Sequence, residues 1–147
     1  MDNRHALIVD CKVMQATGSG EWDAAKVMAA DCSGAHQKTI GADKNDDTKG
    51  FVAEMRRIGV TPHGAQNTAR PGGSAIDSRT TRHEGYAKSI NARRGFEKVF
   101  GWIKQWGGLR QFRQSGTGKV SAVFSLHVIA YNLIRLRNLL KPAMEAA

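Results

Sequence analysis

Cysteine and long apolar runs are both scarce in this sequence of 147 residues. The two cysteines, Cys11 and Cys32, are far apart and form no Cys-x-x-Cys pair, so we predict reduced thiols rather than a disulfide framework or a cysteine metal site. The amino terminus lacks the apolar stretch of a signal peptide. Residues 120–140 are the most apolar segment, but polar side chains interrupt it, which excludes a membrane span. We therefore expect a cytoplasmic protein with no membrane partner.

Acidic residues are scarce in the second half of the chain. Between residues 85 and 144 the sole acid is Glu97. Residues 1–69 contain 8 Lys/Arg against 9 Asp/Glu, whereas residues 70–147 contain 14 against 4, so the net charge of +9 comes from the second half. A basic region of this size attracts polyanions, most often nucleic acid. Charge leaves an alternative open: the basic region could be a surface of the ribosomal-protein type, or a surface that only confers solubility.

Hydrophobic spacing predicts a single α/β domain with a partly parallel sheet, because strands and helices alternate along the chain. Three strands are few for such a sheet. Between the third strand and the next helix, residues 67–88 are rich in Gly, Ser, Thr and Arg, and predict a long basic loop. The predicted strands cover residues 5–15, 38–43 and a segment that starts at 60; the predicted helices cover 21–30, 48–58, 89–106 and 120–140, the last one amphipathic.

Capping residues support the first two predicted helices. Ser19 can cap the first, and either Asp47 or Thr48 can cap the second. Gly59 is suited to end the second helix. These residues therefore set the expected helix boundaries.

The lone acid of the basic half lies on a narrow polar stripe of its predicted helix. At 100° per residue, Arg93, Glu97 and Lys104 fall within about 40° of one another. This stripe borders an apolar face, so Glu97 is expected at the edge of the core. The plain alternative is an ion pair between Arg93 and Glu97, four residues apart. The apolar face is formed by Phe96, Val99, Phe100 and Ile103.

A second acidic cluster follows the predicted strand 38–43. Asp43 ends that strand, where ligands and metals bind in α/β sheets. Asp46 and Asp47 are expected to serve as turn and cap residues, whereas Asp43 has no capping role to fill. A site made of carboxylates alone suits Mg²⁺ or Mn²⁺, and two such ions can support phosphodiester chemistry.

Other candidate sites fail on their spacing. Residues 115–119 read SGTGK, but the first glycine of a phosphate-binding loop and the hydroxyl residue after the lysine are both missing. His63 and His127 are expected to pack or to end strands rather than bind a metal. Trp102 and Trp106 lie four residues apart and are expected to pack rather than to stack on bases.

Several segments together resemble one family. The signature is an arginine, three residues, a glutamate, six residues and a lysine, met here by Arg93, Glu97 and Lys104. The segments GADKNDDT, VTPHGAQNTARPGGSAIDSRTTRHEGY, EKVFGWIK, GGLR and AYNLIRL also look like the corresponding family text. The chain resembles the C-terminal part of bacterial insertion-sequence transposases, which have a ribonuclease H-like catalytic domain and a DDE metal triad.

The resemblance implies roles for individual residues. Asp43 is expected to be the second catalytic aspartate and Glu97 the catalytic glutamate, both as ligands of Mg²⁺ or Mn²⁺. The activity implied is metal-assisted cleavage and strand transfer of DNA, at the element's ends and at a target. The residues expected to contact DNA are Arg93, Lys104, Arg79, Arg82, Arg94, Arg110 and Arg113.

The resemblance also implies that part of the fold lies upstream. The family's first aspartate lies on an earlier strand, and Asp10 corresponds to a later one, so Asp10 is not assigned to the triad. We expect an incomplete ribonuclease H-like fold, a mixed sheet with flanking helices, that lacks its N-terminal strands. Such a truncated transposase should be inactive alone, nucleoid-associated, and prone to associate with itself or with full-length transposase. The alternative is a non-catalytic DNA-binding protein that inhibits the full-length enzyme.

Overall fold

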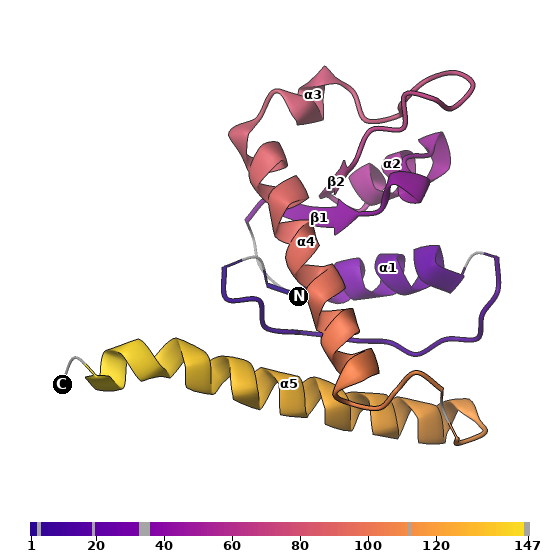
Figure 1. Cartoon of the computed structure of the whole chain (residues 1–147). Coiled ribbons are helices and arrows are strands. Elements are labelled where there is room, and N and C mark those ends of the chain that lie inside the picture. The colour runs from indigo at the N-terminus through magenta and orange to yellow at the C-terminus, as the bar shows by residue number, and fades with distance from the viewer. Residues whose placement is uncertain (3, 19, 33–35, 112, 146–147) are drawn as a thin grey trace. The chain divides into compact units, whose positions relative to one another are not determined.

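The computed structural model describes residues 1–2, 4–18, 20–32, 36–111 and 113–145. The chain divides into two compact units, one formed by Met1–Gln15 with Arg94–Ala147 and the other by Ala16–Arg93. We call them the terminal unit and the sheet unit. The elements, in chain order, are α1 (Gly20–Asp31), β1 (Lys38–Ala42), the 3₁₀ turn η1 (Lys44–Asp46), α2 (Lys49–Arg57), β2 (Val60–Gly64), α3 (Ser78–Thr81), α4 (Glu84–Gln105) and α5 (Thr117–Glu145) (Figure 1).

The sheet unit is built on two parallel strands, β1 and β2, that run side by side (Figure 1). Their register sets Gly41 opposite His63 and Ala42 opposite Gly64, so both strands end at the same edge. One face of this pair packs on α2, which packs in turn on α1. The fold is therefore a small α/β arrangement of two parallel strands with flanking helices. The core contains Ala29, Ala42, Phe51, Met55 and Val60.

The caps of α2 explain its boundaries. The Thr48 hydroxyl accepts a hydrogen bond from the Phe51 backbone N–H at 3.2 Å, which satisfies one of the unpaired donors at the helix start. Gly59, at φ +74°, provides the left-handed residue that ends the helix. Thr48 rather than Asp47 is thus the cap. The predicted helix 21–30 is confirmed as α1, while its expected cap, Ser19, lies outside the described residues.

The predicted strand at residues 5–15 is wrong. No residue of the described stretch 4–18 belongs to a strand. Within the terminal unit, the Asn132 side chain of α5 accepts from the Ile8 backbone N–H at 2.9 Å and donates to the Ile8 carbonyl at 2.8 Å. The Tyr131 hydroxyl donates to the Ala6 carbonyl at 3.1 Å. One amide side chain therefore takes the place that a neighbouring strand would occupy.

The terminal unit also holds the turn between α4 and α5. His127 lies with Nε2 2.8 Å from the Gly107 carbonyl and Nδ1 2.7 Å from the Val123 carbonyl, so its predicted packing role is confirmed. Trp102 packs edge-on against Tyr131, with ring centroids 5.8 Å apart. Trp106, by contrast, is 80% exposed, and the prediction that it packs is wrong.

Both long helices begin earlier than predicted. α4 begins at Glu84, so the loop predicted for residues 67–88 ends earlier and also contains α3. α5 begins at Thr117 rather than at residue 120. Within the part of the chain that the structure describes, no helix combines the length and apolarity that crossing a membrane requires.

Candidate functional site

Asp43 follows β1 directly, at the edge of the sheet where both strands end. Its predicted position at a strand end is therefore confirmed. The expectation that it has no capping role is wrong, because its side chain caps η1 by accepting from the Lys44 backbone N–H. The Asp46 carboxylate completes this capping box by accepting from the Asp43 backbone N–H at 3.0 Å.

A basic partner meets Asp43 from α4. The Arg93 guanidinium lies 3.0 Å from Asp43 Oδ1, and the two side chains are 29% and 58% exposed respectively. The signature arginine, which spacing paired with Glu97 four residues on, therefore binds the strand-end aspartate within the sheet unit. Such a half-exposed pair stabilises a fold little. Its consequence is to position the Asp43 carboxylate.

Asp46 and Asp47 have structural roles, as expected, but Asp47 has a different one from capping. Asp46 accepts from the Trp22 indole N–H at 2.9 Å as well as from Asp43. Asp47 is 1% exposed and accepts from the backbone N–H groups of the following loop. Those donors are Asn67 at 2.6 Å, Ala75 at 2.8 Å and Ile76 at 3.2 Å.

The environment of Asp47 favours its charged form. Burial by itself raises the pKa of the carboxyl, but hydrogen bonds from Asn67, Ser74, Ala75 and Ile76 outweigh it, and the pKa lies below the ordinary 3.8. Asp47 therefore acts as a buried anion that anchors the basic loop to the turn after β1. Sequence spacing could not reveal this role, because all of the donors lie at least 20 residues away and most of them are backbone amides.

The α4 residues of the signature that follow Arg93 belong to the terminal unit. Glu97 and Lys104 are exposed there. Of the predicted apolar face, Val99 and Ile103 are each 3% exposed and belong to a core. Phe96 and Phe100 are not buried; they are exposed and contact each other edge-on, with ring centroids 4.9 Å apart.

The predicted DNA-contacting arginines differ in how far their charge is already matched. Arg79 binds Asp77 through two nitrogens, at 2.9 and 2.7 Å, and Arg56 binds the same carboxylate at 3.2 Å. Arg79 and Arg56 together hold the pKa of Asp77 at about 2, although burial opposes them. Part of the charge of Arg79 is therefore neutralised. Arg82, Arg94, Arg110 and Arg113 are exposed.

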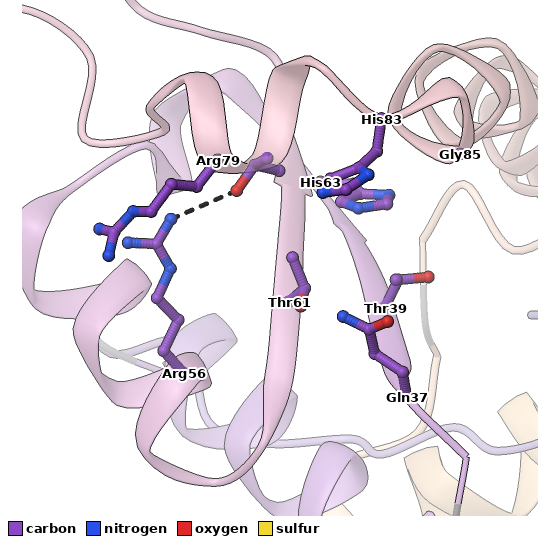
Figure 2. A pocket seen from close by; sticks show the side chains of 9 residues that line it. Gln37, Thr39, Arg56, Thr61, His63, Arg79, His83 and Gly85 are labelled. Atoms are coloured by element: carbon purple, nitrogen blue, oxygen red, sulfur yellow. Dashed lines mark hydrogen bonds between the residues drawn. The ribbon is translucent and has the colours of Figure 1, made fainter.

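The polar face of the sheet carries a cavity of about 340 Å³ that the sequence did not indicate. Figure 2 shows Arg56 and Arg79 on one side of it and His63 and His83 on another. His63 contacts the Ser89 hydroxyl at 2.8 Å; burial, and then His83, lower its pKa. Among the described residues that line the cavity there is no carboxylate, so this lining suits an anion better than a cation.

The described residues include no group of three or more His, Cys, Asp or Glu side chains that could hold a metal ion. Asp43 and Glu97 fall in different units, and the partner found for Asp43 is a cation. The residues described do not, by themselves, make the three-acid site that the resemblance implies.

One comparison identifies the family. No match is found among curated proteins or among solved structures. The family model described as "Transposase DDE domain" matches residues 55–137. This stretch includes the whole Arg93, Glu97 and Lys104 signature and begins after Asp43. DDE transposase domains generally use divalent metals. Because the match spans more than half of the 147 residues, the chain belongs to the transposase DDE domain family.

Proposed function

We propose that this chain binds DNA during transposition as part of a ribonuclease H-like catalytic domain. It contributes Asp43 and Glu97 to a metal-dependent cleavage site and has little strand-transfer activity alone. The observation that carries the proposal is the strand-end position of Asp43 beside Arg93, the first residue of the family signature. The parallel order of β1 and β2, with α2 on one face, is compatible with this fold.

The distribution of charge supports a DNA-binding role. The terminal unit carries 11 Lys/Arg against 4 Asp/Glu, and the sheet unit carries 11 against 9. Most of the net positive charge therefore belongs to the terminal unit, which includes Arg94, Lys104, Arg110 and Arg113. Basic side chains of this kind bind phosphates without regard to base sequence.

Lack of activity in isolation follows from the ligand set. A two-metal site for phosphodiester chemistry holds its ions with several carboxylates. The chain supplies two candidates, Asp43 and Glu97, and we infer that a third carboxylate comes from outside these residues. When bound, Mg²⁺ or Mn²⁺ would supply the charge stabilisation for cleavage.

Duplex binding and plasmid nicking test the proposal. Fluorescence anisotropy with a 30-bp duplex of arbitrary sequence should give a dissociation constant that rises steeply with salt. Arg82→Gln should weaken binding and lower the salt slope by about 1, and Arg79→Gln should weaken it less, because Asp77 already neutralises part of that charge. Absence of binding at low salt would refute the DNA-binding role.

Cleavage separates this proposal from the inhibitor alternative. With Mg²⁺ and a supercoiled plasmid, we expect no nicking by the chain alone. Addition of the chain to a full-length family transposase distinguishes the two roles: inhibition that survives both Glu97→Gln and Asp43→Asn favours the non-catalytic inhibitor. Nicking by the chain alone that Glu97→Gln abolishes would show that the two acids suffice.

A further inference from the structure

Helix α5 has two faces in different surroundings. Val128 is buried, and Tyr131 and Asn132 bind the N-terminal segment of the same unit. The opposite face carries large aliphatic residues that are 41–64% exposed. We call this face the α5 seam; it consists of Leu126, Ile129, Leu133, Leu136 and Leu140.

The spacing of the α5 seam is regular. Successive members are three, four, three and four residues apart, an average of 3.5, which is the repeat of a coiled coil. At 100° per residue the five side chains fall within about 80° of one another, and Val128 and Tyr131 point the other way. Single exposed apolar residues are common on proteins, whereas a stripe with this register marks a helix-pairing surface.

The register itself indicates what covers the seam. In a coiled coil each apolar side chain fits between four residues of a facing helix that has the same spacing. A second α5 has this spacing. An acidic partner helix would need cations beside the seam, but Arg137 is the one charged residue among the flanking positions 125, 130, 132, 137 and 139. The seam therefore fits a second copy of this chain better than an acidic helix.

We propose that two copies of this chain pair along the α5 seam in an antiparallel arrangement. Lys119 falls one heptad before Leu126, at a seam position. A parallel pair would set the two Lys119 side chains against each other, whereas an antiparallel pair places them at opposite ends. Antiparallel helix dipoles also attract, while parallel ones repel. The pairing needs no DNA and does not depend on the proposed function.

Sedimentation equilibrium of the full chain without DNA tests the pairing. Wild type should show twice the 16.0 kDa chain mass at concentrations of tens of micromolar. Leu133→Glu should raise the dissociation constant by on the order of 100-fold or more, because a charge enters the apolar seam of both copies. Ile134→Glu is the matched control, since Ile134 is also exposed, at 47%, but lies off the seam; it should change the constant less than threefold.

Circular dichroism establishes that each variant is folded. If Leu133→Glu unfolds the protein, the milder double variant Leu126→Gln with Leu140→Gln replaces it, because these two residues form the two ends of the seam and are both exposed. A wild type that remains at the monomer mass throughout overturns the proposal. So does a dimer that the seam variants leave intact, or one that Ile134→Glu dissociates equally well.

Discussion

Replacing Asp47 by asparagine should release the basic loop from the sheet unit. The substitution keeps the size of the side chain and one acceptor oxygen, so Ala75 and Ile76 can retain a partner. The new NH₂ group, however, faces the Asn67 backbone N–H, which now donates to Asp47 at 2.6 Å. Two donors in contact cannot bond, and a buried group loses its partner.

The cost can be worked from these contacts. Hydrogen bonds to a charged group contribute about 1.5–3 kcal/mol each, and an unsatisfied buried donor costs about 1–3 kcal/mol. One of the three backbone hydrogen bonds is lost outright, and the other two are weakened by the loss of charge. We therefore expect the free energy of unfolding to fall by about 2–4 kcal/mol. The whole free energy of unfolding of a native protein is about 5–15 kcal/mol, so a loss of this size should strongly destabilise the sheet unit.

Urea denaturation followed by Trp22 fluorescence measures the effect. Trp22 reports on the sheet unit, because it lies 6.0 Å from Phe51 and bonds to Asp46. The variants Trp102→Phe and Trp106→Phe remove the signal of the other unit. Glu84→Gln is the control, because that carboxylate is 92% exposed, and it should change the free energy of unfolding by less than about 0.5 kcal/mol.

The same experiment has a second readout in pH. Because the folded-state pKa of Asp47 is depressed, its contribution is fully present above the unfolded pKa of 3.8 and is lost as pH falls through the folded value. The difference between wild type and Asp47→Asn should therefore shrink below about pH 4. A variant as stable as the Glu84→Gln control at pH 7, or a difference independent of pH, would refute the anchoring role.

Two further predictions concern the edge where the strands end. Gly64→Ala should lower the free energy of unfolding by about 1–2 kcal/mol, because the new Cβ would lie 3.1 Å from Ile76 Cδ1. Gly41→Ala is the control in the same urea assay: it lies on the neighbouring strand with open space around it, and should be neutral or slightly stabilising. A double-mutant cycle of Asp43→Asn with Arg93→Gln should give a coupling free energy below about 1 kcal/mol, because the pair is half-exposed. A larger coupling would show that Arg93 maintains the fold rather than positions Asp43.

Local rules predicted the helices better than they predicted the sheet. α2 is fixed by a cap and a terminating glycine that lie next to it in the sequence, so its boundaries could be predicted from neighbouring residues. A strand also needs a neighbour, which no period-two pattern supplies. Residues 5–15 have the pattern, yet Ile8 bonds to the Asn132 amide of α5 instead of to a strand. The segment is 124 residues away from this partner, and nothing local predicts the pairing.

The candidate site divides in the same way. The position of Asp43 followed from the end of a predicted strand. The family followed from a resemblance carried by the Arg93, Glu97 and Lys104 signature together with several further segments, and not from spacing alone. The partner of Arg93 did not follow, because a helix wheel compares residues of one helix and cannot show that Asp43 approaches from the sheet. The role of Asp47 was equally hidden, since most of its partners are main-chain groups, which any residue type can supply.

The Asp43–Arg93 pair also bears on how a metal could bind at this edge. A guanidinium 3.0 Å from Asp43 Oδ1 occupies a direction from which a divalent cation would approach, and like charges at such distances repel. One carboxylate beside one guanidinium has no net charge, so it attracts Mg²⁺ weakly. Additional carboxylates would be needed to restore a negative site, and they would also offer Arg93 an alternative partner. The pair therefore permits metal binding only when the remaining acids are assembled around Asp43, which is consistent with our proposal that the chain has little activity alone.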